Sequence, residues 1–143
     1  MKLQDCINFQ LTVTQNAVFS YFKGALATLD VTPAQYALLS CLWEKDGQAP
    51  SRLASRLQLD PASMSGLITR TEAKGFITRE YSSTNRRTYK IRVTERGKLV
   101  QEPVTEVISQ CNQQVLQGIS PSDYKVFLKC INVFSCNTQV LDE

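Results

Sequence analysis

Histidine is absent from the 143-residue chain, which removes the commonest general base of catalytic pairs and the usual partner of cysteine in zinc sites. The six glycines stand alone, so the chain contains neither a P-loop nor a dinucleotide-binding fingerprint. No pair of carboxylates stands out as a substitute. We therefore expect a protein that is not an enzyme and that binds no cofactor or metal ion.

Cysteine is present in an odd number, five, at irregular spacings and without a Cys-x-x-Cys pair, unlike a secreted disulfide framework. The long uncharged stretch from Ile7 to Phe22 carries four side-chain amides and is too polar to span a bilayer. The first residues lack the apolar core of a signal peptide. We expect a cytoplasmic, single-domain protein (residues 1–143) that makes no membrane contact.

Charge is unevenly distributed along the chain. Residues 51–98 contain 11 lysines and arginines against four acids, a net charge of +7, and every arginine lies in this region. The rest contains five lysines against nine acids, a net charge of −4, so the whole chain carries +3. A basic centre between acidic ends predicts that the middle of the chain contacts a polyanion.

Hydrophobic periodicity and capping residues predict a mainly helical chain. Apolar residues recur at helical spacing from Ile7 to Leu29. Later helices are expected at about 33–45, 51–57, 61–74, 94–116 and from 121 onward, capped by Thr32, Ser51, Asp60, Thr94 and Ser120, with a kink or restart at Pro103. Two alternating segments between Phe76 and Val93 flank the polar stretch SSTNRR and predict a β-hairpin.

The order of these elements predicts the fold class. Two short helices separated by QLD form a helix-turn-helix candidate, and the hairpin follows at once. We therefore predict a mainly α winged helix-turn-helix with a small β-hairpin wing and long N- and C-terminal helices.

The helix after Asp60 has one side of small, hydroxyl-bearing and basic residues. Its predicted buried side is Met64, Leu67, Ile68 and Thr71. Small residues on the other side would let the helix approach DNA closely, and Ser, Thr and Arg can bond to phosphates and base edges. That side carries Ala62, Ser63, Ser65, Gly66, Thr69, Arg70 and Ala73. Exposed helix positions more often hold Glu, Lys or Gln, so this composition favours a nucleic-acid face over a solvated one.

In these features the chain resembles a MarR-family transcriptional regulator. The resemblance extends over essentially the whole chain, through VTPAQYALLSCLW, SRLASRLQLDPASMSGLITRTEAKGFITRE and VTERG. Its most specific part is the wing, NRRTYKIRVTERG, where Arg87 matches the family's wing arginine and Arg86 stands beside it. The resemblance implies that Arg87 reaches into the minor groove, where narrow A·T-rich stretches concentrate negative potential.

Two positions depart from the family pattern. Asn85 replaces the usual acid, so the partner expected to orient the wing arginine is an amide. Gly66 occupies a position often held by arginine in the recognition helix. The first departure bears on the rigidity of the wing, and the second bears on the strength of the contact with base or phosphate.

The resemblance also implies a homodimer that reads a palindrome in double-stranded DNA, through residues 32–98, with residues 1–31 and 99–143 as dimerisation helices. The apolar terminal helices agree with this, because a chain of this size has little separate core to bury them. Such proteins are typically repressors that release DNA when a small phenolic or aromatic acid enters a cleft. Aromatic side chains that could line such a cleft are Phe19, Tyr21, Phe22, Tyr36 and Trp43.

Two alternatives stay open. TPAQYALLSCLWE also resembles the organic-peroxide-sensing branch of the family, whose first-helix cysteine falls on Asn8 here, with Cys6 about 200° away around a helix. Cys6 is thus a candidate redox residue only in a different register, while Cys41, Cys111 and Cys130 lie in apolar stripes. The other alternative is a winged-helix protein-interaction module without specific DNA binding, against which the arginine-rich centre counts.

Overall fold

The computed structural model describes residues 1–139, and the chain divides into two compact units, Met1–Cys111 and Asn112–Glu143. The predicted fold class is confirmed, because the described residues are mostly helical and include a two-stranded antiparallel hairpin. The last four residues of the expected dimerisation region 99–143 lie outside the described residues. None of the helices within residues 1–139 combines the length and the apolar character needed to cross a bilayer.

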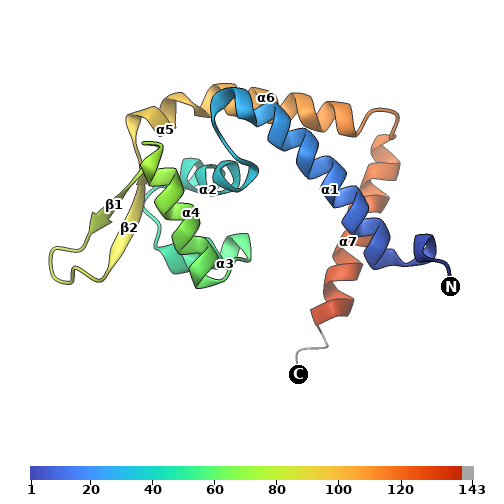
Figure 1. The fold of residues 1–143 in the computed structure, drawn as a ribbon, viewed down its shortest axis with the longest axis horizontal. Helices are drawn as coiled ribbons and strands as arrows, with labels where there is room; N and C mark the ends of the chain where they lie inside the picture. Colours follow the sequence, from blue (N-terminus) through green and yellow to red (C-terminus); the bar gives the residue numbers. More distant parts are fainter. Residues whose placement is uncertain (140–143) are drawn as a thin grey trace. The chain divides into compact units, whose positions relative to one another are not determined.

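The first unit contains the winged helix. A 3-10 turn, Leu3–Asp5, precedes α1 (Ile7–Leu26), and another, Ala27–Leu29, follows it. The elements after them are α2 (Pro33–Glu44), α3 (Pro50–Leu57), α4 (Pro61–Ala73), β1 (Ile77–Tyr81), β2 (Tyr89–Val93) and α5 (Glu95–Leu99). The hairpin projects beyond the α3–α4 pair (Figure 1). Next, α6 (Gln101–Val115) leads into the second unit, which holds α7 (Pro121–Thr138).

Capping side chains set the starts of four helices. At α2, Thr32 Oγ1 accepts the N–H of Gln35 and Gln35 Oε1 accepts the N–H of Thr32, each at 3.1 Å. Asp60, Thr94 and Ser120 each accept the N–H three residues further on, at the starts of α4, α5 and α7. Each cap satisfies a backbone donor that has no partner inside its helix.

Two boundaries differ from the expectation, both because of proline. Ser51 is not the cap of α3: Pro50 takes the first helical position, where its missing N–H and fixed φ are tolerated, so Ala49 is the cap. The restart expected at Pro103 occurs earlier, between α5 and α6. Proline cannot donate to the carbonyl four residues before it, that of Leu99, and clashes with it, so the helix is interrupted directly after Leu99, at Val100.

The core of the first unit sets the orientation of α4. Buried side chains of α2, α4, the residue before β1 and the hairpin form one cluster that includes Leu38, Leu39, Leu42, Met64, Leu67, Ile68, Phe76, Ile77 and Ile91. The predicted buried side of α4 is confirmed, and the buried Thr71 hydroxyl donates to the Leu67 carbonyl at 2.6 Å. The hairpin pairs Ile77 with Val93, which turns Ile91 into the core.

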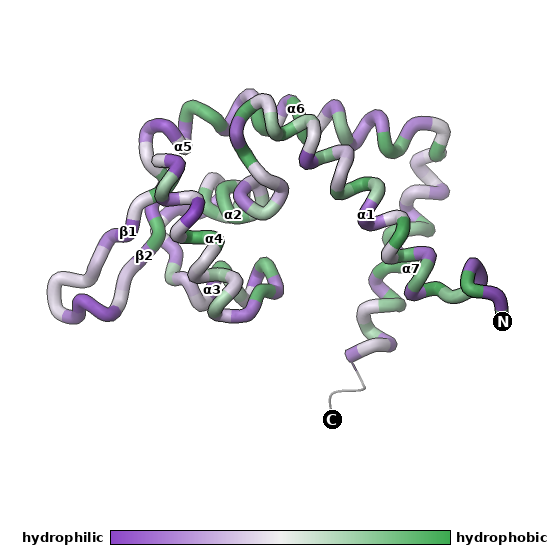
Figure 2. Tube along the Cα trace, in the orientation of Figure 1, coloured by the Kyte–Doolittle hydropathy of each residue, from purple (hydrophilic) through white to green (hydrophobic). Residues whose placement is uncertain are grey.

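The two long terminal helices bury little of their apolar surface. Of the stripe expected on α1, Leu26 is buried, whereas Ile7 and Leu11 are exposed. No residue of α7 is buried, and Phe127 is 53% exposed. Figure 2 shows apolar stretches along both helices, in contrast to the hydrophilic tip of the hairpin.

Candidate nucleic-acid interface

The outer face of α4 forms the first part of the candidate site. Because the opposite face packs in the core, the predicted nucleic-acid residues point away from it: Ser63, Ser65, Thr69 and Arg70 are exposed and Gly66 is half-exposed. No acid lies on this helix between Asp60 and Glu72. The outer face of α4 is therefore exposed, consists mostly of small side chains and carries no acidic residue between Asp60 and Glu72.

Ser63 belongs to the helix cap as well as to this face. Its N–H and its hydroxyl both donate to the Asp60 carboxylate, at 2.8 and 2.7 Å. These two hydrogen bonds hold the pKa of Asp60 below its usual value, so the carboxylate stays charged where the helix dipole favours it. With its proton used in the cap, the Ser63 hydroxyl can meet a ligand only as an acceptor.

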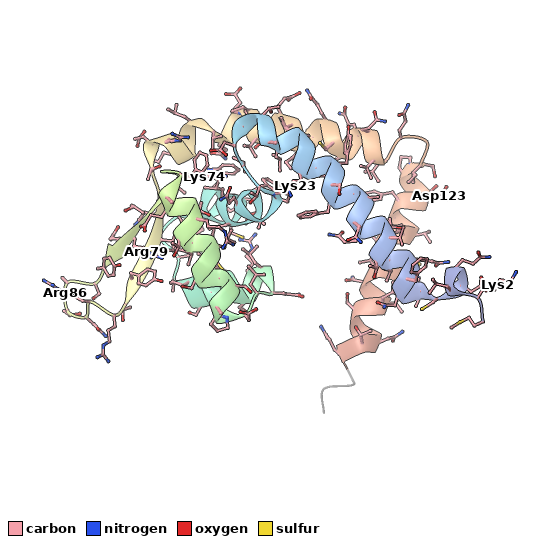
Figure 3. The ribbon with its side chains drawn as sticks, in the orientation of Figure 1. Lys2, Lys23, Lys74, Arg79, Arg86 and Asp123 are labelled. Carbon is pink, nitrogen blue, oxygen red and sulfur yellow. The ribbon has the colours of Figure 1, made fainter. Side chains whose placement is uncertain are left out.

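Arg79 on β1 joins the hairpin to α4, a role that the sequence analysis missed. Its Nη1 lies 2.8 Å from Glu72 Oε1, and its Nη2 donates to Thr69 Oγ1 at 3.0 Å. The guanidinium also lies over the ring of Tyr89, with 5.4 Å between Cζ and the ring centroid. Figure 3 shows Arg79 between the hairpin and the helix. These contacts hold α4 and the wing at a set angle.

Asn85 shapes the wing tip. Its side-chain oxygen accepts the N–H of Arg87 at 3.0 Å, and its backbone carbonyl accepts the N–H of Thr88 at 3.1 Å. A turn of this kind needs the side-chain oxygen and not a charge, so the amide can take the shaping role of an acid. Arg86 and Arg87 are exposed at this tip, where Figure 3 marks Arg86.

The eight arginines differ in their partners. Three are ion-paired: Arg56 with Glu44, Arg79 with Glu72, and Arg92 with Glu80. Arg96 stacks on the ring of Phe76, 5.2 Å from Cζ to the ring centroid. The ion pairs found within residues 1–139 include none of Arg52, Arg70, Arg86 and Arg87. Uncompensated arginine charge therefore lies on α3, on the outer face of α4 and at the wing tip.

The aromatic residues considered for an effector cleft divide between core and surface. Phe22, Tyr36 and Trp43 pack half-buried against the core, and Trp43 Nε1 donates to the Gly97 carbonyl at 3.0 Å. Phe19 and Tyr21 are exposed on α1. Two surface hollows, one at the wing tip and one on α5 and α6, are lined by none of these five side chains. Trp43 therefore has a structural role.

The cysteines also divide by position. Cys6 is the N-cap residue of α1 and is half-buried. Cys41 and Cys111 are buried, and burial raises the pKa of both thiols, which keeps them protonated and unreactive. Cys130 lies on α7, where it is exposed like the apolar residues of that helix. Within the described part of the chain, no group of three or more Cys, Asp or Glu residues could hold a metal ion.

Comparison with known proteins adds to this geometry. A model of the MarR family matches residues 31–89. The organic hydroperoxide resistance transcriptional regulator of Bacillus subtilis (strain 168) is 30% identical over 107 residues, which span 75% of this chain and 73% of that protein. The repressor CouR bound to a 23-mer DNA duplex matches with a TM-score of 0.84 at 18% identity, over 94% of this chain and 98% of that chain. CouR from Rhodococcus jostii RHA1 bound to p-coumaroyl-CoA matches with a TM-score of 0.79 at 21% identity, over 94% of each chain.

Proposed function

Because this chain belongs to the MarR family and is a DNA-binding transcriptional regulator, we propose that it acts as a homodimeric repressor of a palindromic operator. The observation that carries the proposal is the distribution of arginine charge. Arg70 on α4 and Arg86 and Arg87 on the wing have no ion pair within the described residues. Phosphates and base edges of DNA can compensate such charges.

The proposal assigns the two parts of the interface to different grooves. The major groove, about 12 Å wide, admits a helix, and the small residues on the outer face of α4 allow close approach. The wing would enter the adjacent minor groove, where Arg87 responds to groove width and negative potential. The contacts of Arg79 with Glu72 and Thr69 support this, because they keep helix and wing in one orientation.

The exposed apolar surfaces of the terminal helices support the homodimer. Ile7, Leu11 and Val13 on α1 are each at least 40% exposed, and α7 contains no buried residue. A second copy that covers these surfaces would remove them from water. A two-fold dimer would place its recognition helices one DNA turn apart, about 34–36 Å, or a multiple of that.

Two signals are candidates for release of the operator. A small phenolic or aromatic-acid ligand is supported by the half-exposed aromatic residues Phe22 and Tyr36, and by the fold shared with a CouR structure that holds p-coumaroyl-CoA. Hydroperoxide sensing by Cys6 is supported by the likeness to the organic hydroperoxide resistance transcriptional regulator of Bacillus subtilis. We propose the aromatic ligand as the signal, because the residue that falls on the sensing position is Asn8.

The groove assignment predicts different effects for Arg87→Ala and Arg70→Ala. Loss of Arg87 should weaken binding to every duplex and lower the salt slope by about 1, as for one lost phosphate-like contact. Loss of Arg70 should cost about 1–3 kcal/mol at one base pair and relax the preference there. The measurement is affinity at several salt concentrations, on the palindrome protected upstream of the target gene and on scrambled DNA.

Arg86→Ala is the matched control, because it removes the neighbouring arginine at the same exposed tip and should weaken binding less than Arg87→Ala. If Arg87→Ala binds both duplexes as tightly as the wild type, the wing does not contact DNA. If the wild type retains no preference for any duplex, the chain is instead a winged-helix interaction module.

A further inference from the structure

Gly66 stands in the interior of α4, on its outer face. Glycine weakens a helix interior relative to alanine because it loses more conformational freedom on folding. Nothing in the backbone requires glycine here, since position 66 is helical and does not have a positive φ. Nor does the core require it, since the residue is half-exposed. A reason for the glycine has to lie on the outer surface.

That surface is occupied by the side chain of Arg70. A methyl group added at position 66 would lie 3.0 Å from Nη1 of Arg70, 3.8 Å from Cζ and 3.9 Å from Nη2. The guanidinium therefore lies back along the helix, one turn toward the N-terminus, directly over the bare backbone of Gly66. It forms no ion pair within residues 1–139 that would account for this position.

We propose that Gly66 is a specificity-determining residue, because it provides a seat for the guanidinium of Arg70 and thereby decides which base pair Arg70 reads. The inference rests on the proposed binding of α4 in the major groove. A planar guanidinium with paired donors matches O6 and N7 of guanine, so the expected target is a guanine facing the middle of α4. The seat places the donors about one helical turn from the Cα of Arg70.

A side chain at position 66 would remove the seat without disturbing the fold. The three side-chain atoms nearest to the added methyl all belong to the far end of a flexible, exposed side chain, which can move aside. Gly66→Ala should thus strengthen the helix while it displaces the guanidinium. In Gly66→Ala the thermal stability should therefore rise while the sequence specificity of DNA binding falls. If Gly66 served only the fold, the two would not change in opposite directions.

The test is a double-mutant cycle with Gly66→Ala, Arg70→Ala and the double variant. The probe is a duplex that the wild type enriches from random-sequence DNA, together with its single base-pair substitutions. Gly66→Ala should keep or raise the Tm, yet weaken binding to the enriched duplex about tenfold. Its preference should be lost at the same base pair as that of Arg70→Ala. In the Arg70→Ala background, Gly66→Ala should change the affinity less than about twofold, because the seat then has no occupant.

Two further variants serve as controls. Gly24→Ala places a methyl on the exposed side of α1, where no atom of the chain outside the local helix lies within 4 Å, and its Tm measures the gain in helix propensity from glycine to alanine by itself. Arg70→Lys keeps the charge but not the paired donors, so it should retain the salt dependence of the wild type and lose the preference for guanine.

If the losses of binding free energy in Gly66→Ala and Arg70→Ala add up in the double variant, Gly66 does not position the guanidinium of Arg70. The same conclusion would follow from a Gly66→Ala variant that keeps the affinity and preference of the wild type, or from one that unfolds at a lower Tm. In each of these cases, impaired binding by Arg70→Ala or Arg87→Ala would leave the proposed DNA binding standing. A wild type that enriches no duplex would overturn both proposals.

Discussion

Arg79 and Arg70 show how neighbours decide the role of a single residue. Arg79 is held by Glu72, Thr69 and the ring of Tyr89, so its charge serves the fold. Arg70 rests over Gly66 without an ion pair in the described chain, so its charge can serve DNA. Arg92 and Arg87 differ in the same way, because Arg92 is paired with Glu80 whereas Arg87 is exposed at the wing tip.

At the same scale, Cys6→Ser distinguishes the two candidate signals. We expect a salicylate-like acid to weaken operator binding by wild type and Cys6→Ser equally, by about tenfold, a typical coupling between ligand and DNA sites. Cumene hydroperoxide should release neither protein, because Asn8 at the sensing position has no thiol to oxidise. Affinity for the operator with and without each compound is the measurement. Hydroperoxide release that Cys6→Ser abolishes would make Cys6 the sensor.

At the scale of elements, α5 is pressed against the end of the turn that precedes the hairpin. Thr94 caps α5, and its hydroxyl also donates to the Gly75 carbonyl at 2.5 Å. A Cβ on Gly97 would overlap the Phe76 carbonyl oxygen and lie 2.7 Å from Cγ1 of Val93. Trp43 donates to the carbonyl of the same glycine. The contact thus joins α2, α5 and the hairpin, and it depends on the absence of a side chain.

Gly97→Ala should therefore destabilise the protein strongly. The added methyl would collide with backbone, which cannot move aside as a flexible side chain can, and we expect a loss of about 3 kcal/mol or more. Urea unfolding of the variant, compared with Gly24→Ala, measures the effect. The control should be neutral or stabilising by up to about 1 kcal/mol, since its site is open. Unfolding of Gly97→Ala at the wild-type urea midpoint would show that α5 is not packed in this way.

At the scale of the whole molecule, the uncovered apolar surfaces of α1 and α7 predict a dimer. At micromolar concentration, sedimentation should give twice the chain mass of 16.1 kDa. Phe127→Glu puts a charge on an exposed apolar position of α7 and should dissociate the dimer or cause aggregation, because a buried unpaired charge is costly. Lys129→Glu, on the polar side of the same helix, should leave the mass unchanged. A well-folded wild-type monomer would contradict the proposal.

Much of the fold could be predicted because the signals are local. Thr32, Asp60, Thr94 and Ser120 were identified as caps from the residues next to them, and each accepts the expected N–H. The predicted cap Ser51 and the predicted restart at Pro103 were wrong because a proline moved the helix boundary to another residue. The outer face of α4 and the wing tip were likewise predicted from spacing and charge.

The sequence by itself determined the helices, the hairpin and the buried side of α4, because hydrogen bonds and periodicity within a few residues decide them. Only the tertiary structure decided which arginines form ion pairs. The pairing of Arg79 with Glu72 crosses a turn between a helix and a strand, and the bond from Trp43 to Gly97 spans 54 residues. No periodicity reports such contacts, because they depend on how the core orients one element against another. Even Arg70 over Gly66, four residues apart, depends on the rotamer of an exposed side chain, which composition and spacing do not specify.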